Sequence, residues 1–119
     1  FTLVYSFPSP VTAGYVGTYK FADPSNLYQI INCWLTAGTS PTGADLIADV
    51  NKNGTTIFTT QANRPKILAG DVDGVGAAAI PDITGLSEGD RLTVDIDQVG
   101  STVAGDNVAL HVILRRLSG

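Results

Sequence analysis

Residues 44–60 read ADLIADVNKNGTTIFTT, and this stretch decides the fold class. Apolar and acidic residues alternate with a period of two from Asp45 to Val50, interrupted only at Ile47. This alternation is typical of a strand with one buried face. The Asn53-Gly54 pair that follows tolerates the positive φ angles of a two-residue turn. The sequence therefore predicts a β-hairpin over Ala44–Thr60 that turns at Asn53 and Gly54.

Strand signals recur along the rest of the chain, and no stretch of ten or more residues has the apolar spacing of an amphipathic helix. The predicted strands are Thr2–Phe7, Tyr15–Phe21, Leu27–Ala37, Ala44–Asn51, Thr55–Thr60, Val75–Ile80, Arg91–Gln98 and Asn107–Leu117. The predicted fold is all-β, an antiparallel β-sandwich of jelly-roll type with about eight strands. We expect the sandwich to occupy residues 15–119, after an extended N-terminal arm over residues 1–14.

Composition excludes several classes of protein. The 119 residues suffice for one domain, and 44% of them are hydrophobic. The net charge of −4 opposes binding to nucleic acid, and no apolar run is long enough to insert into a membrane. The chain starts at Phe1, contains no Met and shows no signal-peptide pattern, which indicates a processed product or a piece of a longer protein. A single cysteine allows no internal disulfide, so packing or assembly must provide the stability.

Two predicted strands, Leu27–Ala37 and Asn107–Leu117, are apolar on both faces. In the last strand, one face carries Val108, Leu110, Val112 and Leu114. The other face carries the candidate interface residues Ala109, His111, Ile113 and Leu117. A strand buried on both sides needs a second covering layer. Another subunit or long loops of the same chain would provide it.

The residues that catalysis requires are nearly absent. The only histidine, His111, lies in the middle of an apolar strand, and Cys33 stands between an asparagine and a tryptophan, as a small buried side chain would. The chain has no G-x-S-x-G motif around a serine. We expect no enzymatic activity and no cofactor.

Two pairs of acidic residues have a spacing that cation ligands also show. Asp95 and Asp97 lie two apart on one strand face, and Asp71 and Asp73 precede Gly74 in a D-x-D-G pattern. Neither pair comes with the further ligands that a calcium site requires. The sequence therefore predicts no metal site.

Four aromatic residues are the candidates for stacking on sugar rings: Tyr15, Tyr19, Tyr28 and Trp34. Strand alternation predicts that Tyr28, Ile30, Asn32 and Trp34 share one face, mixed with aliphatic side chains. That mixture favours a core or an interface over an exposed sugar platform. Glycan binding remains the alternative.

Two segments carry a resemblance to a known family. Residues 40–65 read SPTGADLIADVNKNGTTIFTTQANRP, and residues 86–102 read LSEGDRLTVDIDQVGST. Both segments resemble a β-rich domain that recurs in structural proteins of tailed bacteriophages, over about Tyr15–Leu117. The resemblance implies a virion component of tail-fibre, baseplate or head-decoration type, and it supplies no catalytic residues. The expected partners of the chain are other copies of itself, neighbouring virion proteins and, as the alternative, a host-surface glycan.

Overall fold

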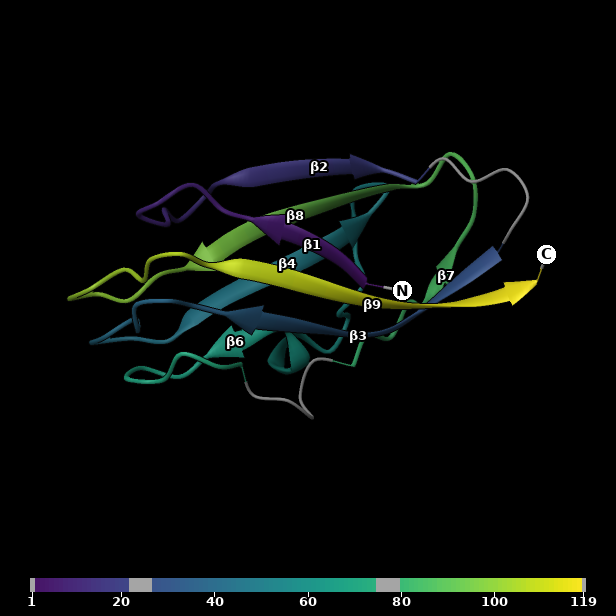
Figure 1. Cartoon of the computed structure of the whole chain (residues 1–119). Coiled ribbons are helices and arrows are strands. Elements are labelled where there is room, and N and C mark those ends of the chain that lie inside the picture. Colours follow the sequence, from purple (N-terminus) through teal and green to yellow (C-terminus); the bar gives the residue numbers. More distant parts are fainter. Residues whose placement is uncertain (1, 22–26, 75–79, 119) are drawn as a thin grey trace.

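The computed structural model describes residues 2–21, 27–74 and 80–118, which form two antiparallel β-sheets stacked face to face (Figure 1). The first sheet contains, in spatial order, β1 (Thr2–Ser6), β9 (Ala109–Ser118), β3 (Leu27–Thr36) and β7 (Gly85–Leu86). The second contains β2 (Val16–Lys20), β8 (Arg91–Gln98) and β4 (Leu46–Lys52), with β5 (Thr55–Thr56) and β6 (Lys66–Ile67) both paired to β4. The only helix in the described residues is the short 3-10 helix η1 (Gln61–Asn63). The all-β prediction is confirmed.

The strand pairs are nested along the chain. The first strand pairs with the last, β2 with β8, β3 with β7, and β4 with β5 and β6. The ladders β3·β9 and β4·β8 then join these pairs into two sheets. The chain therefore follows the path of one long hairpin that is folded over on itself.

The central hairpin is confirmed. Residue Asn51 pairs with Thr56, and the turn residues Asn53 and Gly54 have φ angles of 51° and 86°. Its second strand is shorter than predicted, because the chain turns away after Thr56. Further along this segment, the N–H of Thr60 donates to an Asp82 carboxylate oxygen at 2.8 Å instead of to a strand partner.

The core lies between the sheets and takes the residues that alternation predicts. On β8 the apolar residues Leu92, Val94 and Ile96 are buried. On and just before β9, the predicted inner set of Val108, Leu110, Val112 and Leu114 is buried as well. Side chains of the central segment complete the core, with Ile57 and Phe58 fully buried.

The predicted single face of β3 is wrong, because the strand contains an irregularity. Its register against β9 shifts between Ile30 and Asn32, which places Ile31 as an extra residue. Tyr28 and Ile30 are buried in the core, whereas Asn32 and Trp34 lie on the opposite, outer side. A one-residue insertion reverses the facing of every side chain that follows it.

The predicted N-terminal arm is corrected, because the described part of residues 1–14 belongs to the two-sheet body. Strand β1 pairs with β9 over its whole length, and Phe7 and Val11 are 5% and 3% exposed. Most of the predicted strand Val75–Ile80 lies outside the described residues. The two-residue strands β6 and β7 were not predicted, since so short a segment carries no periodicity.

Candidate interaction surfaces

The outer face of the first sheet carries a shallow groove over β1, β9 and β3. Two of its residues, His111 and Trp34, are register partners on β9 and β3, and Val4 of β1 is the partner of His111 on the other side. The groove has a volume of about 450 Å³ and is lined by Thr2, Ile31, Asn32, Trp34, Thr36, His111 and Ile113. We call these seven residues the outer groove. Val4, beside it, is 57% exposed and Ile31 is 39% exposed.

The structure places the four candidate interface residues on two surfaces. His111 and Ile113 line the outer groove, and Ala109 follows on the same face between Ser6 and Thr36. Leu117 is 54% exposed near the far end of β9, where it borders a separate hollow with Leu27. Three of the four thus share one face, with Leu117 beyond it.

His111 makes one side-chain contact of note, a hydrogen bond of 3.2 Å between its Nε2 and the Thr36 hydroxyl. In the described residues no carboxylate is hydrogen-bonded to the ring. Catalytic histidines that activate a hydroxyl are oriented by such a third group. The contact therefore fixes the ring on the sheet surface and provides no arrangement for nucleophilic catalysis.

Cys33 is fully buried between the sheets. Burial, and then the charge of Asp49, raise the pKa of its thiol to about 12. The reactive form of cysteine is the thiolate, which this environment disfavours. The interpretation of Cys33 as a small buried side chain is confirmed.

The four candidate sugar-stacking aromatics do not form one platform. Tyr28 is buried, with its ring edge-on to Phe21 at 4.9 Å between centroids. The Tyr15 hydroxyl is hydrogen-bonded to that of Tyr5 at 2.6 Å, and its ring packs on the core. Tyr19 is 44% exposed on β2, and Trp34 lies half-buried in the outer groove. Burial excludes Tyr28 from stacking on a ligand, and Trp34 stands apart from the other two.

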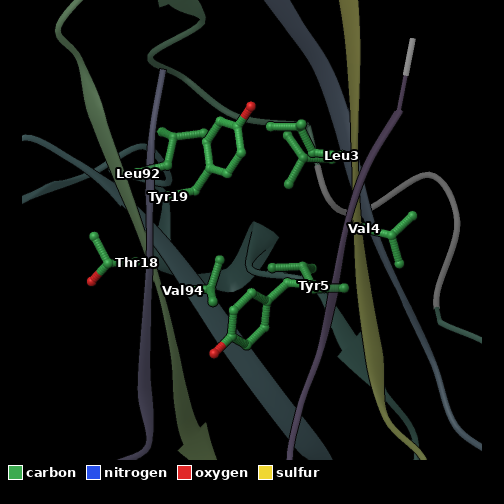
Figure 2. A pocket seen from close by; sticks show the side chains of 9 residues that line it. Leu3, Val4, Tyr5, Thr18, Tyr19, Leu92 and Val94 are labelled. Carbon is green, nitrogen blue, oxygen red and sulfur yellow. The ribbon is translucent and has the colours of Figure 1, made fainter. Parts of the chain in front are cut away.

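A second cavity opens between the edge strands β1 and β2 (Figure 2). It has a volume of about 70 Å³ and is lined by Leu3, Val4, Tyr5, Thr18, Tyr19, Leu92, Val94, Leu110 and Val112. We call it the edge slot. Its lining is almost entirely apolar, and the inner residues belong to the hydrophobic core. The slot is thus a gap at one side of the core.

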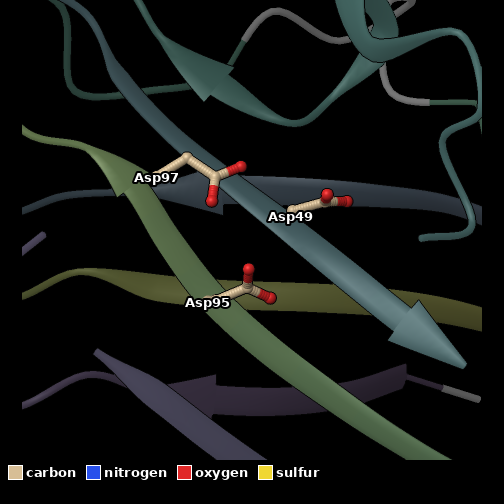
Figure 3. Close-up of side chains that lie close together, drawn as sticks. All are labelled: Asp49, Asp95 and Asp97. Atoms are coloured by element: carbon tan, nitrogen blue, oxygen red, sulfur yellow. The ribbon is translucent and has the colours of Figure 1, made fainter. Parts of the chain in front are cut away.

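Three aspartates gather on the outer face of the second sheet (Figure 3). Asp49 on β4 is the register partner of Asp95 on β8, and Asp97 follows two residues later. One carboxylate oxygen from each lies within 4.8 Å of the others. The sequence predicted the pair Asp95 and Asp97 but not Asp49, because the pairing of β4 with β8 is not visible in local sequence. Asp71 and Asp73 are exposed and form no such group in the described residues.

Each carboxylate of this cluster has a polar partner. Asp49 is 6% exposed and accepts hydrogen bonds from the Val50 N–H at 2.8 Å and the Thr56 hydroxyl at 2.7 Å. Asp95 accepts a hydrogen bond from the Asn51 side-chain amide at 2.7 Å, and Asp97 accepts one from the Arg64 guanidinium at 2.6 Å.

Burial raises the pKa of Asp95 to about 6, and the negative charges of Asp97 and Asp49 add to this effect. A carboxyl group with such a pKa is partly protonated near neutral pH. The cluster can therefore relieve its repulsion with a proton, a guanidinium and neutral donors, without a metal ion.

No helix in the described residues has the length and apolar character needed to pass through a bilayer. The surfaces that remain as candidates for function are the outer groove, the edge slot and the aspartate cluster. Comparison of the chain with protein-family models, curated proteins and solved structures finds no match.

Proposed function

We propose that this chain is a non-enzymatic structural and adhesion domain of a tailed-bacteriophage virion, in a tail fibre, a baseplate or a capsid decoration. It would act through protein–protein surfaces and not through chemistry. The observation that carries the proposal is the outer groove, an apolar and aromatic surface on the middle of a sheet. The resemblance of residues 40–65 and 86–102 to a domain of phage structural proteins supplies the setting.

The strand order supports a sandwich of jelly-roll type. Because β5 and β6 both pair with β4, they count as two parts of one strand. When they are counted together as strand 5, the strands β7, β8 and β9 become strands 6, 7 and 8. The two sheets then have the orders 1-8-3-6 and 2-7-4-5. This is the order that results when one long hairpin of eight strands is rolled into two sheets, and it recurs in viral capsid and lectin domains.

The chemistry of the outer groove favours a protein partner. Trp34 and Ile113 are half-buried there, and Ile31 is exposed. Tryptophan in a shallow apolar surface is the kind of residue that dominates the binding energy of protein interfaces. Contiguous apolar surface left in water favours association. Neighbouring virion proteins or further copies of this domain would cover it.

Among the described residues, the His111 ring is hydrogen-bonded to the Thr36 hydroxyl and to no carboxylate, and Cys33 is buried, which supports a non-enzymatic role. The net charge of −4 argues against nucleic acid as the partner.

One observation favours a second candidate function, glycan binding. The outer groove combines the indole of Trp34 with the polar side chains of Asn32, Thr36 and His111. Sugar sites use an aromatic face for the ring and amide or hydroxyl groups for its hydroxyls. In that case the groove would hold a saccharide of a host surface.

A mass-spectrometric inventory of purified particles tests the first proposal, using a phage that encodes this sequence. We expect peptides of this chain in the particles at a copy number above one. Absence of the chain from the particles would overturn the proposal. A titration of the isolated domain with mono- and oligosaccharides, followed by the Trp34 indole resonance, tests the alternative. A saturable shift that Trp34→Ala abolishes would establish glycan binding, and no shift would exclude it for those sugars.

A further inference from the structure

Strand β1 is an edge strand with an unpaired row of backbone groups. The Phe7 N–H donates to the Val108 carbonyl at 2.9 Å, directly after β1. Because hydrogen-bonded residues alternate along an antiparallel ladder, Leu3 and Tyr5 direct their backbone groups toward β9 as well. The N–H and C=O groups of Thr2, Val4 and Ser6 therefore point away from β9. In the described part of the chain, β1 pairs with β9 alone.

The edge of β1 lacks the features that normally protect such strands from pairing. Its sequence, TLVYS, contains no charged residue, no proline and no glycine. The neighbouring edge strand β2 has the sequence VGTYK, with Gly17 in its interior and Lys20 at its end. Natural edge strands are commonly protected by charges, prolines or irregularities. Of these two edges, that of β1 is thus the one suited to receive another strand.

We propose that β1 pairs antiparallel with β1 of a second copy of this chain, about a two-fold axis at Val4. This register places Val4 opposite Val4 and Thr2 opposite Ser6, so that all three residues with free backbone groups find partners. The three pairs would form about six hydrogen bonds, two in each pair. A shift of two residues in either direction would leave part of the row unpaired. The first sheets of the two copies would become one continuous sheet.

Side chains at this edge support the same partner. The Val4 side chain is 57% exposed and lies on the opposite side of β1 from Leu3 and Tyr5 (Figure 2). In the paired state it would pack beside Val4 of the second copy, as cross-strand neighbours do. Since neither strand is charged, no like charges would meet along the ladder. The edge slot lies between β1 and β2 and would have its mouth covered by the second copy.

The expected strength of this pairing follows from its size. Five residues span about 17 Å, and a single strand pair buries less than the ~1,200 Å² of standard stable interfaces. The dimer should therefore be concentration-dependent for the isolated domain. It would be well populated where copies are held close together. The pairing uses backbone groups of one edge, not the outer groove, and does not rest on the proposed function.

Amide hydrogen exchange of the unmodified chain tests the pairing directly. It would be measured by NMR from tens of micromolar to about millimolar concentration, with the dimer fraction taken from sedimentation equilibrium. We expect the Val4 and Ser6 amides to exchange roughly tenfold more slowly once nine-tenths of the chain is dimeric. The Val16 and Thr18 amides, which point outward from β2 by the same alternation, should show no such change. A chain that stays monomeric, or a dimer that leaves the Val4 and Ser6 amides unprotected, would overturn the proposal.

Two pairs of variants sharpen the test. Val4→Pro removes the outward N–H and keeps an apolar side chain, and Val16→Pro is its match, because both valines are 57% exposed on edge strands. We expect Val4→Pro to abolish the dimer and Val16→Pro to retain it. Should either variant fail to fold by circular dichroism, Val4→Cys and Val16→Cys replace them. Paired residues lie about 5.5 Å apart, so air oxidation should link two copies through position 4 but not through position 16.

Buried Cys33 should not compete in this reaction. Equal cross-linking through both positions would contradict the pairing. A dimer that Ile113→Asp dissociates and Val4→Pro does not would place the interface in the outer groove. That result would overturn the edge pairing and leave the proposed function intact.

Discussion

Tyr5 of β1 and Gly17 of β2 are opposed across the gap between the two sheets, and the Tyr5 ring occupies the space that a Cβ on residue 17 would need. The Tyr5 hydroxyl is hydrogen-bonded to the Tyr15 hydroxyl at 2.6 Å. The Tyr5 ring packs edge-on against Phe7, with 5.0 Å between the ring centroids. The hydrogen bond to Tyr15 is the main cause that raises the pKa of Tyr5 above its usual value. The Tyr5 side chain of the first sheet thus packs directly against the backbone of Gly17 in the second sheet.

The first prediction concerns this contact. Gly17→Ala should destabilise the fold by about 1–3 kcal/mol, because the added methyl group must displace the Tyr5 ring. Urea unfolding measures the loss. The control is Gly85→Ala in β7, where a Cβ meets no atom within 4 Å and φ is not positive. Equal stability of the two variants would contradict the tight contact.

The second prediction concerns the hairpin turn. Gly54→Val should lower the free energy of unfolding by on the order of 1 kcal/mol or more, since Gly54 has a φ of 86° that a β-branched residue adopts only with strain. A Cβ there has open space around it, so the cost is conformational and not steric. Gly85→Val, without positive φ, is the matched control. The turn assignment would be wrong if urea unfolding gave the same midpoint for Gly54→Val and the parent chain.

The third prediction concerns pH. The folded pKa of Asp95, about 6, lies above the ~3.9 of an unfolded aspartate. The folded state therefore binds this proton more tightly, and the resulting stability is fully present below pH ~4 and lost as pH rises through about 6. Asp95→Asn should stabilise the fold at pH 7 by on the order of 1 kcal/mol after solvent screening, and much less at pH 4.

Urea unfolding across this pH range provides the measurement, with the exposed Asp71→Asn as control. Comparison with the parent chain isolates Asp95 from the other acids. Asp82 is one of these, because a hydrogen bond from the Thr60 N–H lowers its pKa. Parallel pH profiles of parent and Asp95→Asn would refute the assignment.

The fourth prediction concerns metal ions. Millimolar calcium or a chelator should leave the melting temperature unchanged. The reason is that Arg64, Asn51 and Thr56 already donate hydrogen bonds to carboxylate oxygens of the aspartate cluster. Scanning calorimetry checks this. A rise of several degrees with calcium that Asp97→Asn removes would show a metal site instead.

The fifth prediction concerns the outer groove. Ile113→Asp should leave the domain folded and abolish the proposed docking to virion proteins, since Ile113 faces away from the core between Thr2 and Asn32. Circular dichroism and co-sedimentation with particles provide the two measurements. Thr2→Asp, at the rim of the same groove, is a milder comparison. Unfolding of Ile113→Asp would place this residue in a core and contradict the surface role.

Sequence alone predicted those features that depend on neighbouring residues. The Asn53-Gly54 turn was correct because the φ requirement is local, and the two faces of β9 followed from alternation. The predicted face of Trp34 was wrong, because the irregularity at Ile31 cannot be recognised in the residue composition of β3.

The same limit applies to the aspartate cluster and to β1. Asp49 joins Asp95 only through the β4·β8 ladder, and these two residues lie 46 positions apart in the chain. Strand β1 was predicted as a strand but assigned to an arm, because the prolines after Ser6 resemble a linker. Its ladder partner, β9, is at the other end of the sequence.

The central position of β9 in the first sheet has a consequence for biosynthesis. Both β1 and β3 pair with this strand, which follows them in the sequence and therefore leaves the ribosome after them. During translation the two earlier strands must therefore wait with their ladder edges open until residues 109–118 emerge. Pairing over such sequence separations is slow. The nascent chain is consequently exposed to mispairing with neighbouring copies until residues 109–118 have emerged.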